Sequence, residues 1–549
     1  MHGMPLVAYT IWTAAAQELK ARKARALGAF EPCIWNTVDR LPFTWSSYPD
    51  FVRYSRRGWK YTEKYEAYAR LGQVWALVTP VTMYLHVADS DAIGEVFARR
   101  GEFVRPLKEY KLLEIYGPCI STVGDEWSRH RKVVAAPFNE SIMEFVWEES
   151  LRQARNMLRC WVSASESGIR SVKKDTRTLS LNVLASAAFR KSYEFRGSAE
   201  PAINNEATSY RDSLQIVLDN IILLLVIPFS LLTSHIVPKR WGKVGKATVS
   251  FKEHMRRMLD RETEALTKGV PGSGGIMTSF ARALRVHNQE AKDPEQKNSD
   301  NVKKGLSVEE IFGNVFVINF AGHDTTAVTF AFSMLLLAAY PSVQEWIAEE
   351  IREVTKDIPI EEWDYKVLFP VLKRCRAVMF ETLRIYPPIP ALPRVASRVT
   401  QTVPVGDRTL VIPPGVNTTI PLKAVQSSPG YWPDPETWKP SRWISQTTSD
   451  SIISNERGLS EELLPPKPGT YFPWSDGPQK CPGKKFSEVE AVAVLACIFQ
   501  QHRLLIQKRA GESDEAAQKR VLACTHEITV LALLKMTNSD KVCLICKKV

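Results

Sequence analysis

The spacing of hydrophobic and polar residues predicts a mostly helical chain with strand-like patterns in two places. The first, from Val74 to Val87, is rich in β-branched and aromatic residues and contains a proline suited to a hairpin turn. The second, from Arg398 to Val416, alternates and turns at Gly406-Asp407 and at Pro414-Gly415. Because the small sheets are set to one side of many helices, we expect an α+β fold.

One predicted helix is apolar on almost every face. Ser307 and Glu310 have the spacing of a capping box, so the helix is expected to begin directly after Ser307. Apolar residues then run from Ile311 to Leu337, and the helix is expected to end near Tyr340-Pro341. A helix without a polar face is typical of the centre of a protein, so we expect it to be buried.

The stretch between Lys268 and Gly305 is the most linker-like part of the chain. It opens with several glycines that no strand precedes, so we expect a mobile surface loop rather than a phosphate-binding loop. No linker divides the chain into comparable halves. We therefore expect one catalytic domain over 51–549, preceded by a separate segment at 1–50.

Two apolar runs suggest contact with a membrane. The run from Met4 to Ala16 is shorter than the ~20 residues of a spanning helix, and basic residues follow it. Segment 1–50 is thus expected to lie along a membrane interface or to be the remnant of a longer anchor. The run 221–232 contains Pro228 and is expected to dip into a membrane or to lie in the core, a transmembrane helix being the alternative.

Composition narrows the class of protein. The chain has 549 residues, of which 44% are hydrophobic and 24% charged, as in a large globular protein. Its nine cysteines are an odd number and thinly spread, which indicates reduced thiols facing the cytosol. The net charge of +12 favours an anionic membrane surface or an acidic protein. Its basic clusters are scattered, so nucleic acid is not an expected partner. Cys543 and Cys546 lack a second pair of zinc ligands and are expected in a strand.

Polar residues interrupt the buried helix at Ala321-Gly-His-Asp-Thr-Thr326. A buried acid is costly unless it has a partner, so a function is expected there. In one interpretation Thr325 donates a proton or holds a water, and Asp324 relays protons from outside. The alternative is a hydrogen-bonded polar plug or a solvated kink. His323 lies on another helical face and is expected to be satisfied by packing rather than to bind a metal.

Cys481 lies in a loop of prolines, glycines and short polar residues directly before a long apolar helix. A thiolate that binds a metal needs access on one side and amide donors around its sulfur. Gly477 and Gly483 allow a close approach, Pro482 adds no competing N–H, and the helix beginning at Lys484 offers the positive end of its dipole. The loop thus indicates a thiolate held against a flat cofactor.

A charged pair lies earlier in the chain. In Glu381-Thr-Leu-Arg384 the opposite charges are three residues apart and share one helix face. A proline-rich segment from Tyr386 to Arg394 ends that helix and extends the chain.

Taken together, these motifs resemble those of the cytochrome P450 family. Trp474 to Gly483 resembles the family's haem-binding loop, 321–326 its oxygen-activating helix, and Glu381 to Arg384 its charged pair. Pro440-Ser-Arg-Trp443 is similar to the segment whose arginine, here Arg442, joins Glu381 and Arg384 in a structural triad. Trp127-Ser-Arg-His-Arg131 resembles the helix that binds the haem propionates. The stretch 117–140 is similar to filamentous-fungal members.

The resemblance implies a haem-thiolate monooxygenase. Haem b would take Cys481 as its axial iron ligand and would be held by Trp127, Arg131, Arg394, Trp474, Gly477 and Gly483. Thr325 and Asp324 would deliver protons while oxygen is inserted into a C–H or C=C bond. The chain shows no dinucleotide fingerprint and no flavin domain. A separate NADPH-dependent flavoprotein reductase is therefore implied. Its acidic surface would dock on the face of this protein that carries Lys480, Lys484 and Lys485. The implied location is the cytosolic face of the endoplasmic reticulum membrane, with peripheral or weak anchoring.

The chain departs from the family pattern at three positions. Trp474 replaces the usual phenylalanine and keeps an aromatic ring beside the sulfur. Gln479 replaces the usual arginine or histidine, so one propionate loses a charge-assisted partner, for which the remaining donors must compensate. Ser441 replaces a common glutamate, a change that concerns the fold rather than the chemistry.

The expected substrate is a lipophilic small molecule, with a role in secondary-metabolite biosynthesis. The segments that resemble the family's pocket are mostly apolar; they are 110–120, 205–232, 316–322, 389–392 and 526–529. Two alternatives stay open. One is a haem-thiolate enzyme that couples, dehydrates or isomerises without net oxygen insertion. The other is a non-catalytic, membrane-associated binding protein.

Overall fold

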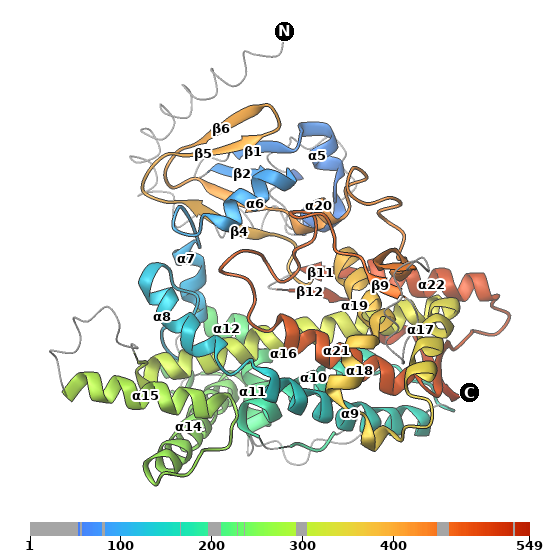
Figure 1. Cartoon of the computed structure of the whole chain (residues 1–549), viewed down its shortest axis with the longest axis horizontal. Coiled ribbons are helices and arrows are strands. Elements are labelled where there is room, and N and C mark those ends of the chain that lie inside the picture. The colour runs from blue at the N-terminus through green and yellow to red at the C-terminus, as the bar shows by residue number, and fades with distance from the viewer. Residues whose placement is uncertain are drawn as a thin grey trace.

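The computed structural model describes residues 53–54, 58–78, 83–164, 166–190, 192–195, 210–227, 229–234, 237–292, 305–446, 461–530 and 533–549. The predicted segment 1–50 lies outside these residues, as does the predicted proline turn of the first hairpin. In Figure 1 the strands β1, β2, β5 and β6 lie at the top and a body of long helices lies below them. The predicted α+β architecture, helix-rich with small sheets to one side, is confirmed.

The helices of the described residues are α4 Trp59–Thr62, α5 Glu66–Leu71, α6 Ser90–Ala98, α7 Leu107–Tyr110, α8 Gly124–Ala135, α9 Glu140–Ser163, α10 Val172–Phe189, α11 Tyr210–Asp219, α12 Ile221–Val226, α13 Phe229–Leu232, α14 Lys239–Thr267, α15 Ile276–Lys292, α16 Val308–Ala339, α17 Pro341–Val354, α18 Tyr365–Val371, α19 Lys373–Ile385, α20 Leu422–Gln426, α21 Lys484–Phe499 and α22 Asp514–His526. The strands are β1 Val74–Val78, β2 Met83–Val87, β3 Phe103–Val104, β4 Leu392–Ala396, β5 Gln401–Val405, β6 Arg408–Ile412, β7 Asn417–Ile420, β8 Ile444–Gln446, β9 Glu461–Leu463, β10 His502–Ile506, β11 Ile528–Val530, β12 Leu534–Met536 and β13 Leu544–Lys548.

The largest sheet has five strands in the order β1-β2-β7-β4-β3. β1 and β2 pair antiparallel with Ala76 opposite Leu85, as the first strand pattern predicted. β2 and β7 are parallel, so the first predicted strand region pairs with residues that directly follow the second one, which itself lies in another sheet. β5 and β6 form a separate antiparallel hairpin whose turn contains Gly406, at φ 58°, where a glycine avoids strain.

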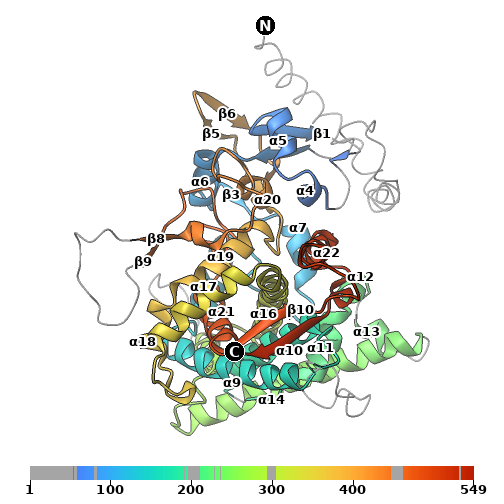
Figure 2. The same cartoon turned by 90° about the vertical axis from the view of Figure 1, so that its right-hand side faces the viewer.

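The central helix α16 has the predicted start and end. The Ser307 side chain accepts from the Glu310 amide, and the Glu310 side chain accepts from the Ser307 amide, which completes the capping box. The C-terminal cap is Tyr340, directly before Pro341. α10 packs along α16, and α9 packs along α21. Figure 2 shows α16 almost end-on, with α9, α10 and α21 beneath it. The core of the helical body therefore surrounds α16.

The prediction of a surface loop between Lys268 and Gly305 is wrong for residues 276–292, which form helix α15. Its buried residues Ile276, Met277, Phe280, Ala281 and Leu284 recur at helical spacing, and α15 packs against α14. The first part of the polar sequence that suggested a loop, Asn288 to Lys292, forms the mostly exposed last turn of this helix. Residues 293–304 lie outside the described part of the chain.

The apolar run 221–232 is divided between two short helices, α12 and α13. No single helix among the described residues is both long and apolar enough to cross a membrane. α16 and α17 meet these criteria only as a pair and are bent by 107° where they join.

Candidate active site

The loop that carries Cys481 is closed by its own backbone. The Cys481 amide donates to the carbonyl oxygen of Trp474 at 2.8 Å. Gly477 has φ 66°, and a side chain there would collide with the carbonyl oxygen of Phe97, so only glycine fits. A Cβ at Gly483 would lie 3.8 Å from the Cys481 sulfur, an ordinary contact. The close approach that the sequence predicted at both glycines is therefore required by the protein at Gly477 alone.

The sulfur of Cys481 is open on one side and enclosed by protein on the others, since the residue is exposed although its surroundings desolvate it. Burial raises the pKa of the thiol, while the Gly483 amide and the positive charge of Arg131 act in the opposite direction. A metal cation on the open side would favour the thiolate strongly.

Four donors from distant parts of the chain face this region. Trp127 and Arg131 come from α8, Arg394 from β4, and Arg105 from the loop after β3. The indole N–H of Trp127 is buried and has no hydrogen-bond partner within the described residues. Such an orphaned donor indicates a missing acceptor.

The three arginines bond only to backbone carbonyls in the described part of the chain. Arg131 Nη1 donates to Lys480 O at 2.8 Å, and Arg394 Nη1 donates to Pro393 O at 2.9 Å. Arg105 Nη1 donates to Ile120 O at 2.7 Å. No described carboxylate forms an ion pair with any of them.

Burial lowers the pKa of Arg394 to about 10, and burial is also the main cause of the lowered pKa of Arg105 and of Arg131. Arg105 lowers the pKa of Arg394 further, and Arg131 lowers that of Arg105, so the cations repel one another. An orphaned indole donor beside uncompensated cations fits a ligand with two carboxylates, as haem has in its propionates. The residues present therefore fit a haem group.

The sequence did not point to Arg105, because no motif marks it and only the fold carries it to Gln479. Its Nη2 donates to the backbone oxygen of Gln479 at 3.5 Å. The side-chain oxygen of Gln479 is buried and unpaired within the described residues. The guanidinium of Arg105 therefore lies beside position 479, where family members usually have an arginine or histidine two residues before the cysteine.

The polar residues inside α16 divide between two faces. Thr325 Oγ1 donates to the Ala321 carbonyl at 2.8 Å. Ala321 is exposed in the middle of an otherwise buried helix, so this face of α16 is open. Asp324 is buried and lies 2.6 Å from Arg177 Nε and 3.5 Å from Lys535 Nζ. The polar plug proposed as the alternative describes Asp324 but not the open face that includes Thr325.

His323 is fully buried, and its Nδ1 lies 2.8 Å from the Asn319 carbonyl, as expected for a residue satisfied by packing. Its Nε2 also lies 3.1 Å from Asp324 Oδ1, a contact that the sequence did not predict. Burial alone would raise the pKa of Asp324, but His323, Arg177 and Lys535 together hold it well below its usual range.

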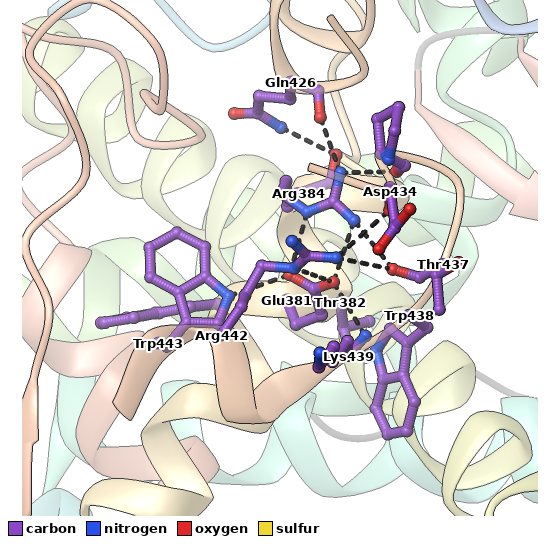
Figure 3. Close-up of polar contacts among 12 residues, drawn as sticks. Glu381, Thr382, Arg384, Gln426, Asp434, Thr437, Trp438, Lys439, Arg442 and Trp443 are labelled. Atoms are coloured by element: carbon purple, nitrogen blue, oxygen red, sulfur yellow. Dashed lines mark hydrogen bonds and ion pairs between the residues drawn. The ribbon is translucent and has the colours of Figure 1, made fainter. Parts of the chain in front are cut away.

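Glu381, Arg384 and Arg442 meet in a closed cluster (Figure 3). Both oxygens of Glu381 accept from the guanidinium of Arg384 at 2.9 Å, and Oε1 also accepts from Arg442 Nε at 3.0 Å. Two further donors, which the sequence analysis did not predict, also bond to the Glu381 carboxylate. They are Trp443 Nε1 at 2.9 Å and the Lys439 amide at 2.9 Å.

The remaining donors of Arg384 are satisfied by backbone oxygens. Nη1 donates to Gln426 O at 2.8 Å and to Pro435 O at 2.7 Å, and Nη2 donates to Thr437 O at 3.1 Å. The side chains of Glu381 and Arg384 are 0% exposed. This cluster therefore joins α19 to the segment 426–443 and needs no ligand.

Other predicted site residues have partners within the chain. Trp474 Nε1 donates to Ser487 Oγ at 3.0 Å, and Lys484 lies 5.4 Å above the Trp474 ring. Lys485 pairs with Glu140 at 2.6 Å. Cys546 lies in β13 as predicted, whereas Cys543 lies one residue before that strand, so the strand prediction is wrong for Cys543; both are buried.

One group of described residues, Glu126, His130 and Glu310, brings ligand-type atoms within 4.8 Å of one another. Arg129 pairs with both carboxylates, so an ion-pair network accounts for this group.

The segments predicted to line the pocket lie partly together. Tyr116 packs against Phe316 with ring centroids 5.3 Å apart, which joins 110–120 to 316–322. The Leu534 amide donates to the Pro388 carbonyl at 2.9 Å, so the β11–β12 hairpin lies beside the segment that precedes 389–392. Residues 205–209 of the predicted pocket are outside the described part of the chain.

Comparisons with known proteins agree with this geometry. A family model described as cytochrome P450 matches residues 51–531. A cytochrome P450 monooxygenase of Arthrobotrys oligospora is 27% identical over 534 residues, which cover 94% of this chain and 90% of that protein. The cytochrome P450 monooxygenase prx9 of Penicillium rubens is 27% identical over 515 residues, covering 89% and 87%. The phomenoic acid biosynthesis cluster cytochrome P450 monooxygenase of Leptosphaeria maculans is 28% identical over 472 residues, covering 79% and 75%.

A crystal structure of a cytochrome P450 superposes with a TM-score of 0.64 at 17% identity and covers 88% of this chain and 96% of that one. At this identity the match shows the fold, which agrees with the fold that the sequence motifs implied. The fungal sources of these relatives also agree with the resemblance found in the sequence.

Proposed function

The chain belongs to the cytochrome P450 family and is a monooxygenase, and on that premise we propose that it uses haem b to hydroxylate or epoxidise a lipophilic small molecule in secondary-metabolite biosynthesis. A role in such a pathway is supported by the Leptosphaeria relative, which is named for the phomenoic acid biosynthesis cluster. A non-catalytic binding protein is set aside, because the family and the relatives are enzymes.

The proposal rests on one observation, which is that an open thiol lies among three arginines, one buried and two partly buried, that have no carboxylate partner within the described residues. Cys481 would bind the iron of haem through its thiolate, and Trp127, Arg131, Arg394 and Arg105 would hold the propionates. When bound, haem with a thiolate ligand supplies the activation of O₂.

The residues of α16 would handle the protons. Thr325 lies on the open face, where its hydroxyl can hold a water or donate a proton into the site. Asp324, one residue earlier, faces charged groups from other elements and would take protons from outside. An enzyme that only isomerises or dehydrates needs no such relay, so these residues favour oxygen insertion over that alternative.

Electrons would come from a separate NADPH-dependent flavoprotein reductase. Lys480 and Lys484, beside the thiolate loop, suit an acidic docking partner, although Lys484 lies 3.9 Å from Glu488, and Lys485 is paired with Glu140. We place the protein on the cytosolic face of the endoplasmic reticulum membrane, in peripheral contact through the first 50 residues and the run 221–232, as their apolar sequences favour. The catalytic domain in this proposal is 51–549.

The test is the carbon-monoxide difference spectrum of the dithionite-reduced protein beside a Cys481→Ala control. We expect a red-shifted Soret band that the control lacks. Its absence from folded protein expressed with ample haem would refute the proposal. Incorporation of one atom from labelled O₂ into a product then separates oxygen insertion from isomerisation.

A further inference from the structure

The loop 114–123, directly before α8, contains no helix or strand, yet side chains from other parts of the chain hold it. The Ile120 amide donates to Asn314 Oδ1 on α16 at 2.8 Å. The Ile120 carbonyl accepts from Arg105 Nη1 at 2.7 Å. Both backbone polar groups of Ile120 are therefore bonded without any help from secondary structure, which leaves this residue one position in the fold.

Asn314 is fully buried, and its side-chain amide uses every partner within reach. Its Nδ2 donates to the Glu310 carbonyl at 2.7 Å and lies 2.8 Å from His130 Nδ1 on α8. Because an amide nitrogen only donates, His130 Nδ1 accepts, and the imidazole proton lies on Nε2, 3.4 Å from Glu310 Oε1. Burial lowers the pKa of His130, which favours this neutral form. Asn314 thus joins the loop to α8, the helix that carries two residues of the proposed haem site.

The loop also touches α16 where only glycines fit. Gly117 has φ 139°, and a side chain there would collide with the Glu309 carbonyl. A side chain at Gly313 would collide with the Gly117 carbonyl in turn. Next to this contact, the Tyr116 hydroxyl donates to the Thr248 carbonyl of α14 at 3.2 Å. Both ends of this short segment are therefore tied to long helices.

This segment lies beside the place proposed for haem and substrate. Ile120 is half-buried and packs against the apolar cluster that contains Phe316. The Tyr116 ring contacts the Phe316 ring directly. Arg105, which holds the Ile120 carbonyl, is one of the cations assigned to the propionates. Residues 116–121 therefore stand between α16 and the proposed haem site, where they form one wall of the substrate pocket.

We propose that Asn314 is a positioning residue that makes 116–121 a fixed wall of the substrate pocket, so that Ile120 limits the size of the molecule that reaches the haem site. A loop that is bonded before a ligand arrives cannot move aside without losing these contacts, so the pocket selects by shape. The enzyme then accepts a narrow range of lipophilic sizes rather than a broad one. This inference rests on the proposed function, in which a lipophilic substrate binds beside haem.

The main experiment measures ligand binding rather than turnover. Ferric holoenzyme is mixed with imidazole, a small haem ligand, or with clotrimazole, a bulky one, and the shift of the Soret band gives each association rate. Asn314→Leu keeps the size of the side chain and removes its hydrogen bonds. Clotrimazole should bind this variant about tenfold faster than the wild type, the effect of one buried hydrogen bond. Imidazole should bind both proteins at the same rate, because it does not need the wall to move.

Asn319→Leu is the matched control. Asn319 lies on the same helix, is 1% exposed, and donates from Nδ2 to the Val315 carbonyl at 2.7 Å, as Asn314 does to Glu310. Its amide forms no hydrogen bond with the described loop, so this variant should bind both ligands at wild-type rates. A loss of stability alone would affect both ligands alike. If clotrimazole and imidazole change by the same factor in Asn314→Leu, the inference is overturned.

Hydrogen exchange gives a second readout that needs no haem ligand. The amides of 117–122 should exchange up to about tenfold faster in Asn314→Leu than in Asn319→Leu, because one amide there loses its acceptor. Gly313→Ala should have the same effect by pushing the loop off α16. Gly94→Ala, where an added methyl group meets nothing within 4 Å, should not. Unchanged exchange in both Asn314→Leu and Gly313→Ala would also overturn the inference.

The proposed function and this inference fail in different ways. If the folded wild type takes up no haem, the proposed function is wrong and the inference falls with it. If the wild type binds haem and both ligands, and Asn314→Leu binds them at wild-type rates, only the inference is wrong. Clotrimazole that binds Asn314→Leu but not the wild type would support the fixed wall most strongly.

Discussion

Two arginine clusters in this protein differ in whether the chain itself supplies their anions. Around Glu381, each buried guanidinium meets a carboxylate and several carbonyls, so the cluster is complete. Near Cys481, Arg105, Arg131 and Arg394 meet only carbonyls in the described chain, and the Trp127 indole has no acceptor. A cluster whose charges and donors all have partners in the chain stabilises the fold by itself. A cluster that lacks anions contributes its full stabilisation only when a ligand supplies them.

The largest effect should come from breaking the complete cluster. Glu381→Gln leaves Arg384 and Arg442 without a negative charge in a buried site, which should lower the free energy of unfolding by about 3–5 kcal/mol. Urea denaturation measures this loss. Asp407→Asn is the matched control, because the Asp407 side chain is 94% exposed, and it should not change stability. If both variants unfolded at the same urea concentration, the cluster would not have the structural role assigned to it.

Glu490 offers a third case for the comparison, because it is a buried acid that belongs to neither arginine cluster. Burial raises its pKa to about 8, and its Oε1 has no partner in the described residues. The folded state then keeps a proton that the unfolded state releases above about pH 4.5. Stability should therefore fall as pH rises through the window up to about 8, by roughly 2 kcal/mol between pH 6 and pH 8.

Glu490→Gln should remove this part of the slope, as measured by denaturant unfolding at several pH values. Exposed Glu95→Gln on α6 is the control and should keep the wild-type slope. Parallel curves for the wild type and Glu490→Gln would show that Glu490 ionises normally in the folded protein.

Arg394→Gln should have opposite effects on stability and on binding. Removing a buried cation without an anion should leave the apoprotein as stable as the wild type or slightly more stable. Haem affinity should fall about tenfold, because one charge-assisted hydrogen bond is lost. Haem titration of the apoprotein, followed by Soret absorbance, measures the affinity. A strongly destabilised apoprotein would show instead that Arg394, like Arg384, stabilises the fold without a ligand.

The smallest effect should come from Gln479→Arg, which restores the cation common in the family. Haem affinity should rise about threefold, while the apoprotein loses less than about 1 kcal/mol to added repulsion. Arg105→Gln should weaken haem binding less in this background than in the wild type, if Arg105 supplies the charge that Gln479 lacks. An equal loss of haem affinity in both backgrounds would show that Arg105 does not supply the charge that Gln479 lacks.

Local signals in the sequence were enough for several elements. Ser307 and Glu310 predicted the start of α16, because a capping box involves only neighbouring residues. The same holds for the β1–β2 and β5–β6 hairpins. The interpretation of 276–292 as a loop was wrong because glycines and charges outweighed an apolar stripe that gains its stability only by packing.

The sequence by itself determined the spacing of Cys481, Gly477, Thr325, Glu381 and Arg384, and through that spacing the family and its chemistry. The tertiary structure alone decided which distant groups complete each site. Arg105 reaches Gln479 across 374 positions of sequence, and Arg177 reaches Asp324 across 147. Such partners leave no local pattern, because their charges interact through space after the chain has folded.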